Sequence, residues 1–246
     1  MPVAVVVTCK GRLAHLQATA PLILGTGLVG YVLVDWGCPQ GSGAWLSRAF
    51  PGTLIIRTES TGFEKTKAAN LGAKAAIQAG YDTLLFLDAD TVVHPPVLRW
   101  FVANARPDRF QYITAKDPRG EIRKSLTGIL QVPAAPFAQV GGFDTTFGQT
   151  YGNEDVELRL RLWRLAGLGF ETVPEPLVES GAIAAIEHGD ELRTAWYPDK
   201  DLERNQQRTL EHLVKKYSSY TGGANLGLDQ KRGPHAHTLN LLLGVA

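Results

Sequence analysis

This sequence of 246 residues has little cysteine or methionine and almost no net charge: it contains two cysteines and one methionine, and its formal net charge is +1. The two cysteines, Cys9 and Cys38, are too few for a disulfide framework and lack the spacing of a metal site, so we expect a reducing cytoplasm. A charge this close to zero provides no overall field that would attract nucleic acid or a membrane surface.

Long apolar runs are missing as well. No stretch approaches the ~20 apolar residues of a membrane span. The apolar start MPVAVVV has no basic leader and no small-residue cleavage site, so we expect a first strand there and no signal peptide. Without repeats or a linker, the chain is predicted to form one domain over residues 1–220. The C-terminal tail, 221–246, is predicted to be mobile or to pack on that domain.

Short β-branched runs alternate with longer helical patterns in the first half of the chain. The predicted strands span residues 3–9, 30–37, 52–58 and 82–90, and helical spacing covers residues 11–24 and 64–80. This alternation predicts an α/β fold with a mostly parallel, doubly wound central sheet flanked by helices. Ligands of such sheets gather at the carboxyl ends of the strands. The polar residues and the cysteine expected along that edge are Thr8, Cys9, Asp35, Arg57, Thr58, Asp88 and Asp90.

The second half of the chain is less regular. Strands are predicted at 111–115 and 125–133, and a short helix leading into a glycine-rich turn within 132–144. The segment 153–167 has the pattern of a strong helix, and 201–217 that of a further amphipathic helix.

Asp88 and Asp90 end the apolar run LLFLDADTVV, residues 84–93. Two such aspartates can be the nucleophile and acid/base pair of a haloacid-dehalogenase-type phosphatase, with Asp88 as nucleophile, or the metal hook of a nucleotide-sugar glycosyltransferase. They can also simply terminate the strand. Side chains two residues apart on a strand point the same way, and like charges held together need a cation or donors to compensate them. The spacing therefore favours a divalent ion held by oxygen ligands.

Two longer blocks resemble one family. GFEKTKAANLGAKAAIQAGYDTLLFLDADTVV, residues 62–93, resembles the segment of β-1,4-galactosyltransferase-like and related GT-A glycosyltransferases in which Phe-x-Arg/Lys and an Asn-x-Gly helix precede Asp-x-Asp. TGILQVPAAPFAQVGGFDTTFGQTYGNEDVELRLRLW, residues 127–163, resembles the same families' Gly-Gly-Phe, aromatic-Gly-x-Glu-Asp and helix. The resemblance implies a single Rossmann-like GT-A domain and a hexosyl- or pentosyltransferase. Such an enzyme uses a nucleotide-diphosphate sugar such as a UDP-sugar together with Mn²⁺ or Mg²⁺.

The resemblance also implies roles for individual residues. Asp90 and His188 would bind the metal, and Asp88 would hold the ribose or the metal's second shell. Tyr151 would bind the acceptor sugar. The residues with implied donor-binding roles are Thr8, Asp35, Phe63, Lys65, Asp88 and Gly128.

Glu154 and Asp155 have two interpretations. Acids in the first turn of a helix favour the macrodipole, with Asn153 as the N-cap, and Glu157 with Arg161 is expected to be only a surface pair. With the resemblance, Asp155 is instead the general base that faces the acceptor hydroxyl in an inverting transfer, and Glu154 binds a sugar. Retaining polypeptide transferases carry a similar helix, so retention stays an alternative. The presence of Asp155 as a base on the face opposite the leaving diphosphate favours inversion.

The sequence departs from the galactosyltransferase pattern in places. Lys65 replaces Arg, Val156 replaces a further acid, and no membrane anchor is found, which argues against a Golgi enzyme. These changes leave the sugar and the acceptor open: a glycan, a peptide, a small molecule or a modified nucleobase. A non-catalytic nucleotide- or sugar-binding module remains an alternative. Four further histidines are expected outside the site: His15 at the surface or half-buried, His94 in a loop, and His235 and His237 in the tail.

Overall fold

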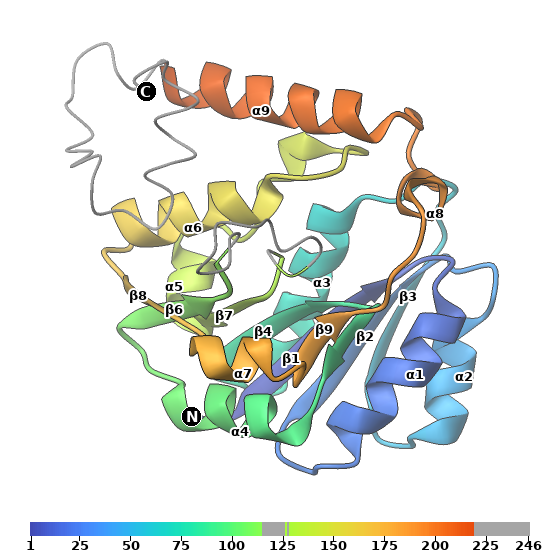
Figure 1. The fold of residues 1–246 in the computed structure, drawn as a ribbon, viewed down its shortest axis with the longest axis vertical. Helices are drawn as coiled ribbons and strands as arrows, with labels where there is room; N and C mark the ends of the chain where they lie inside the picture. The colour runs from blue at the N-terminus through green and yellow to red at the C-terminus, as the bar shows by residue number, and fades with distance from the viewer. Residues whose placement is uncertain (115–125, 127, 219–246) are drawn as a thin grey trace.

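A seven-stranded sheet forms the centre of the protein (Figure 1), seen in a computed structural model that describes residues 1–114, 126 and 128–218. The strand order is β3-β2-β1-β4-β7-β6-β8. The strands are β1 (Val3–Cys9), β2 (Gly30–Trp36), β3 (Leu54–Thr58), β4 (Thr83–Asp88), β6 (Arg109–Tyr112), β7 (Leu130–Pro133) and β8 (Gly169–Thr172). A separate small sheet pairs β5 (Thr91–Val93) with β9 (Ile183–Ala185).

The pairing confirms the predicted mostly parallel sheet. Strands β3, β2, β1 and β4 are parallel neighbours, while β7 runs antiparallel to both β4 and β6, and β8 is parallel to β6. The four parallel strands therefore send their carboxyl ends to one edge, which is where ligands of such sheets bind.

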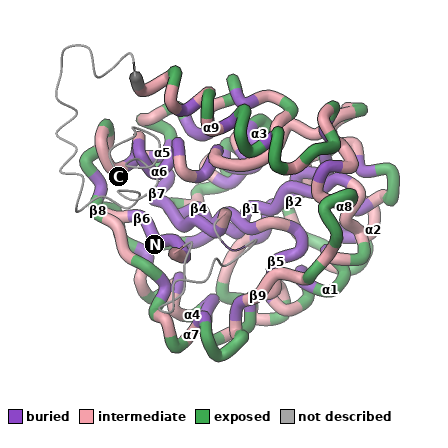
Figure 2. Tube along the Cα trace, turned by 45° about the horizontal axis from the view of Figure 1, so that its top comes forward, coloured by how far each residue is buried: buried purple, intermediate pink, exposed green. Residues whose placement is uncertain are grey.

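Helices cover both faces of the sheet, because successive side chains of a strand point to opposite sides. Val5 and Val7 of β1 pack in one apolar cluster with α1 (Leu13–Leu24), α2 (Ser42–Ala49) and α4 (Pro95–Asn104). Ala4 and Val6 pack in the other with α3 (Lys65–Gln78), α5 (Ala134–Gln139) and α6 (Glu154–Arg164). Figure 2 shows the resulting arrangement, in which the central strands are buried and much of the outer surface of the helices is exposed.

Helix α3 matches the prediction for residues 64–80 closely. Its buried face is small, with Ala69, Gly72, Ala73 and Ala76 turned to the sheet. A Cβ at Gly72 would lie 2.5 Å from Cγ1 of Val6, so a side chain there would push the helix away from the strand. The close approach of α3 to β1 also places Lys65, the first residue of the helix, at the edge of the sheet.

Several elements were not expected from the sequence. Helices α2 and α4 were not predicted, although Pro95 and Pro96 at the start of α4 are a favourable way to begin a helix. The strand predicted at 82–90 ends at Asp88, and Thr91–Val93 forms β5 of the second sheet. Residues 115, 125 and 127 of the two strands predicted in the second half of the chain lie outside the described residues, as does the tail 221–246 with His235 and His237.

The remaining elements all follow α5 in the chain. They are η1 (Thr145–Phe147), α7 (Glu175–Glu179), α8 (Asp190–Thr194) and α9 (Leu202–Ser218). The longest of these is α9, with 17 residues. Within residues 1–114, 126 and 128–218, no helix combines the length and apolarity that crossing a membrane requires.

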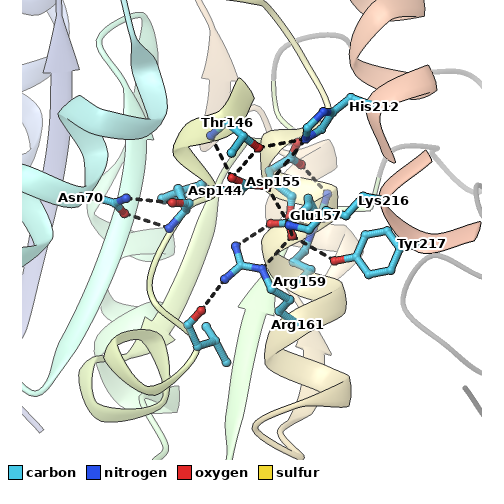
Figure 3. Close-up of polar contacts among 12 residues, drawn as sticks. Asn70, Asp144, Thr146, Asp155, Glu157, Arg159, Arg161, His212, Lys216 and Tyr217 are labelled. Atoms are coloured by element: carbon cyan, nitrogen blue, oxygen red, sulfur yellow. Dashed lines mark hydrogen bonds and ion pairs between the residues drawn. The ribbon is translucent and has the colours of Figure 1, made fainter. Parts of the chain in front are cut away.

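A buried charged cluster joins α9 to α6 (Figure 3). Glu157 is 0% exposed, and its carboxylate accepts from Arg161 (2.7 and 2.5 Å), from Nζ of Lys216 (2.5 Å) and from the hydroxyl of Tyr217 (2.9 Å). Lys216 also contacts Asp144 at 2.7 Å. The prediction that Glu157 and Arg161 form only a surface pair is therefore wrong, because α9 covers them.

We expect Glu157→Gln to lower the free energy of unfolding by about 2 kcal/mol. Arg161 and Lys216 lose their charged partner, and the amide NH2 cannot accept a hydrogen bond as the second carboxylate oxygen does. Urea unfolding followed by circular dichroism measures this change. Glu203→Gln on the exposed surface of α9 is the matched control. Equal stability of the two variants would mean that the cluster contributes nothing to the docking of α9.

Candidate active site

The carboxyl ends of β1, β2, β3 and β4 bring the predicted polar residues together. Thr8 lies opposite Asp88 in the register of β1 and β4, and Cys9 lies opposite Asp35 in that of β1 and β2. Asp35 in turn lies opposite Arg57 on β3. The predicted edge is thus present, as expected for parallel strands that end at similar heights.

Lys65 is the centre of the pocket at this edge. Its Nζ lies 2.9 Å from Oδ1 of Asp88 and 3.1 Å from Oε1 of Glu154. Burial alone would lower the pKa of Lys65, but the two carboxylates outweigh it and hold that pKa well above its usual value. Gly128 closes against the same pair, since a Cβ there would lie 3.3 Å from Oδ2 of Asp88 and 3.5 Å from Nζ of Lys65. A side chain at Gly128 would crowd the pocket.

The pocket around Lys65 is lined by apolar residues of the sheet and by a polar set. The polar and glycine residues of the lining are Thr8, Lys65, Thr66, Asp88, Gly128, Glu154 and Asp155. Predicted donor-binding and catalytic residues therefore share one pocket, between the sheet edge, the first turn of α3 and the first turn of α6.

Asp90 and His188 meet although 98 residues separate them in the sequence. Nε2 of His188 lies 2.6 Å from Oδ2 of Asp90. The antiparallel pairing of β5 with β9 causes this contact, since β5 starts directly after Asp90 and β9 ends shortly before His188. The backbone of Ile186 reinforces it by donating to the carbonyl of Asp90 at 2.8 Å.

The donor atoms of Asp90 and His188 suit a divalent ion. A carboxylate oxygen beside an imidazole nitrogen is a mixed set that Mn²⁺ accepts, with phosphate oxygens and water to complete the shell. Asp88 does not join them and faces Lys65 instead. In the part of the chain that the structure describes, no group of three or more His, Cys, Asp or Glu side chains is gathered around one point. The residues fit a metal site that a bound nucleotide diphosphate would complete.

Asp155 is buried and paired with Arg159, one turn further along α6 (Figure 3). Nη2 of Arg159 donates to Oδ2 of Asp155, and the guanidinium lies 4.8 Å from the centre of the Tyr112 ring. Burial raises the pKa of Asp155, and the charge of Arg159 opposes that shift. Asp155 is thus a carboxylate whose basicity is increased by its surroundings and whose orientation is fixed by one neighbour.

Asn153 positions the start of α6 in a way that the sequence did not indicate. It is the only non-glycine residue with positive φ (64°) among the described residues, and it follows Gly152 with φ 100°. Its side chain does not cap α6; Nδ2 donates to Oγ1 of Thr209 on α9 at 2.9 Å. The predicted N-capping hydrogen bond is therefore absent, and α9 holds the turn that presents Glu154 and Asp155.

Asp35 is engaged by the backbone that follows it. Its Oδ1 accepts from the Cys38 amide and its Oδ2 from the Gly43 amide, both at 2.8 Å. Asp35 therefore fixes the turn between β2 and α2. A nucleotide base at this position would have to use the remaining lone pairs of the carboxylate or the groups that this turn presents.

Aromatic side chains gather beside the pocket. Tyr197 is buried and lies between Phe63 (6.0 Å between ring centres) and Tyr151 (6.1 Å). The amide of Phe63 donates to the carbonyl of Trp196 at 3.0 Å. The segment after α8 thus joins the predicted donor residue Phe63 to the predicted acceptor residue Tyr151. Tyr197 and Trp196 were not identified from the sequence.

Two basic residues of this edge were also missed. Arg12 joins the segment of Leu192 to Asp90. Its Nη2 donates to the carbonyl of Leu192 at 3.1 Å, and its Nη1 is 3.8 Å from Oδ2 of Asp90. Lys10 is buried and donates to three backbone carbonyls of the turns after β2 and β3. The available signal was their place directly after β1, at the ligand-binding end of a parallel strand.

Solved structures that share this fold include glycosyltransferases of the GT-A fold. The chain is similar to residues 1–349 of TarS from S. aureus, with a TM-score of 0.56, 15% identity and coverage of 100% of this chain and 80% of that one. It is similar to the catalytic domain of Drosophila β1,4-galactosyltransferase 7 in complex with xylobiose, with a TM-score of 0.55, 18% identity and coverage of 81% and 76%. GalNAc-T7 with UDP, GalNAc and Mn²⁺ gives a TM-score of 0.59 and 15% identity, covering 97% of this chain and 54% of that one.

A family model agrees with this class. The model described as the N-terminal domain of galactosyltransferase matches residues 109–189, about a third of the chain. A comparison with curated protein sequences finds no match. The fold and the family match confirm the predicted resemblance to GT-A glycosyltransferases and, at the level of that class, the prediction of a glycosyltransferase enzyme. His188, Asp155 and Tyr151 all fall within the matched segment.

Proposed function

We propose that the protein transfers a sugar from a nucleotide-diphosphate donor to an acceptor hydroxyl with inversion, that Asp155 is the general base, and that a divalent ion is required. UDP is the proposed nucleotide, because the solved structure of GalNAc-T7, which shares this fold, contains UDP and Mn²⁺. The observation that carries the proposal is the contact of Asp90 with His188 beside the pocket of Lys65, Glu154 and Asp155.

Asp90 and His188 are the proposed ligands of Mn²⁺ or Mg²⁺. When bound, the ion supplies charge that stabilises the departing nucleotide diphosphate. Lys65 lies 2.9 Å from Asp88 and Arg12 lies 3.8 Å from Asp90, so we propose that both charges bind the phosphates of the donor. Lys65 would then exchange part of its contact with Asp88 for a phosphate oxygen, which frees Asp88 to hold the ribose.

The acceptor is proposed to enter over Tyr151, whose ring lies beside that of Tyr197. Aromatic rings of this kind bind the apolar face of a sugar. One carboxylate oxygen of Asp155 is taken by Arg159, which leaves the other for the acceptor proton. Glu154, which contacts Lys65 at 3.1 Å, is proposed to bind a hydroxyl of a sugar. Thr8, Asp35, Phe63 and Gly128 complete the proposed donor site.

A thermal-shift panel tests this function. Nucleoside diphosphates and nucleotide sugars with different bases are added with Mn²⁺, with Mg²⁺ or with EDTA. A ligand that binds only the folded state stabilises it by about 2.7 kcal/mol at a concentration of 100 times Kd. We expect a metal-dependent shift with one nucleotide base, UDP above all. If no nucleotide diphosphate gives a metal-dependent shift, the protein is not a transferase of this kind.

Turnover separates the transferase from the other hypotheses. A binding module would show the nucleotide shift without releasing the diphosphate from a nucleotide sugar. A phosphatase with Asp88 as nucleophile would hydrolyse simple phosphate esters and form an acyl-phosphate, and the GT-A fold disfavours it. Candidate acceptors of the four predicted kinds, which are glycans, peptides, small molecules and modified nucleobases, are then compared for the rate of diphosphate release.

A further inference from the structure

The two cysteines of the chain lie at the edge of the sheet formed by the carboxyl ends of the parallel strands, beside the proposed nucleotide site. Cys9 is the last residue of β1, and Cys38 lies in the turn after β2. Both thiols are reduced and buried, and both contact the hydroxyl of Ser42, at 3.3 Å from Sγ of Cys9 and 3.0 Å from Sγ of Cys38. The two sulfurs therefore lie next to one shared hydroxyl. Two cysteines that are 29 positions apart in the sequence are thus brought together around Ser42.

The surroundings of the two thiols differ. Cys9 is 0% exposed, and hydrogen bonding to Cys38 together with burial raises its pKa. Cys38 is 9% exposed and accepts a hydrogen bond from the amide of Gly11 at 3.2 Å. Hydrogen bonds from Cys9, Ser42 and Gly11 lower the pKa of Cys38. Cys38 therefore has the thiolate character and the access of an attacking group, while Cys9 keeps its proton.

We propose that Cys38 and Cys9 form an oxidation-sensitive pair, in which a peroxide converts the two thiols into a disulfide and thereby weakens nucleotide binding. The thiolate of Cys38 attacks one peroxide oxygen, the O–O bond breaks, and the products are a sulfenic acid and water once the departing oxygen is protonated. The sulfur of Cys9 then attacks the sulfur of Cys38, and the sulfenic hydroxyl leaves as water with the proton of Cys9. Two thiols and one peroxide thus give one disulfide and two waters.

The disulfide would act on the turn that Asp35 organises. The sulfurs must approach to about 2 Å, closer than any hydrogen-bonded pair. Cys38 would then shift toward β1, and its amide, which donates to Asp35 at 2.8 Å, would shift with it. Lys10 donates to the carbonyls of Trp36 and Gly37, which lie between Asp35 and Cys38 in the sequence. A shift of Cys38 would therefore disturb the part of the site that is proposed to bind the nucleotide base. The effect on binding rests on the proposed function, because Asp35 and Thr8 are proposed donor contacts.

The experiment uses the full chain, reduced with dithiothreitol, desalted and titrated with hydrogen peroxide. Non-reducing peptide mapping by mass spectrometry follows the cysteines, and the affinity for UDP with Mn²⁺ is measured on the same samples. We expect a Cys9–Cys38 disulfide, reversed by dithiothreitol, with affinity for UDP reduced about tenfold. The chain helps the assignment, since it has no further cysteine and one methionine, Met1.

Three variants distinguish the roles of the thiols. In Cys9→Ser, peroxide should stop at sulfenic acid on Cys38 or proceed to higher oxides, without a disulfide. In Cys38→Ser, the fully buried Cys9 should remain unmodified at the same dose. Because a hydroxyl at the buried position 9 is unfavourable, Cys9→Ala is tested beside Cys9→Ser. Both Cys9 variants should keep their affinity for UDP after a mild peroxide dose.

The outcomes separate this proposal from the function it rests on. If peroxide oxidises either cysteine of the wild-type protein without forming a disulfide between them, the proposed oxidation-sensitive pair does not exist. A disulfide that leaves the affinity for UDP unchanged overturns the coupling. If the reduced protein binds no nucleotide, the transferase proposal and the coupling both fail, and peptide mapping still decides whether the pair forms.

Discussion

Asp90→Ala is expected to abolish the Mn²⁺-dependent part of the stabilisation by a nucleotide diphosphate. The variant removes one of the two proposed protein ligands and leaves His188 alone to hold the ion. Stabilisation of about 2.7 kcal/mol at 100 times Kd would fall to the value measured with EDTA. Thermal unfolding with UDP, in the presence of Mn²⁺ or of EDTA, gives this difference directly.

The comparison must use the ligand-induced shift and not the melting temperature itself. Asp90 also neighbours Arg12, so Asp90→Ala changes the stability of the free protein as well. Asp82→Ala is the matched control. Asp82 is exposed and lies directly before β4, whereas Asp90 lies just after the other end of that strand. If the metal-dependent stabilisation by UDP persists in Asp90→Ala but is lost in His188→Ala, Asp90 is not a metal ligand.

The residues of the sheet edge could be predicted because their position follows from local patterns. Apolar runs of five to seven residues identify β1 to β4, and the parallel arrangement places the ends of those strands together. Thr8, Asp35 and Asp88 thus needed only the strand boundaries. Lys65 was predicted from the resemblance of Phe63-x-Lys65 to the family's Phe-x-Arg/Lys, and the regular pattern of α3 predicted the helix that it begins.

Contacts made by the last third of the described chain could not be predicted in this way. The contact of His188 with Asp90 depends on β5 and β9, two strands of three residues each with little local signal. Glu157 and Arg161 have the spacing of an exposed helical pair, and only the packing of α9 buries them. Asn153 has the residue type of an N-cap, yet its side chain bonds to α9. In each case a distant segment decided the environment of a local motif.

Asp155→Asn is expected to lower the rate of sugar transfer by about 10²- to 10⁴-fold, the usual contribution of a general base. The amide keeps the size of the carboxylate and can still accept from Arg159, but it cannot take the acceptor proton. The affinity for UDP with Mn²⁺ should stay close to that of the wild type, since Asp155 is not a proposed donor contact. Release of UDP from the donor sugar that the thermal-shift panel identifies measures the rate. Unchanged turnover would assign the base to another residue.

The pH dependence of transfer gives an independent test of the same role. A base must be deprotonated, so the rate falls as pH drops through its pKa. Burial raises the pKa of Asp155, which moves this acid limb above the range of an ordinary aspartate. The charge of Arg159 holds that pKa down, so Arg159→Met should move the limb to still higher pH. Because Arg159 is itself buried against Tyr112, we expect a less stable variant, and rates are taken below its unfolding temperature. An acid limb that stays in place in Arg159→Met would show that Asp155 is not the group that titrates.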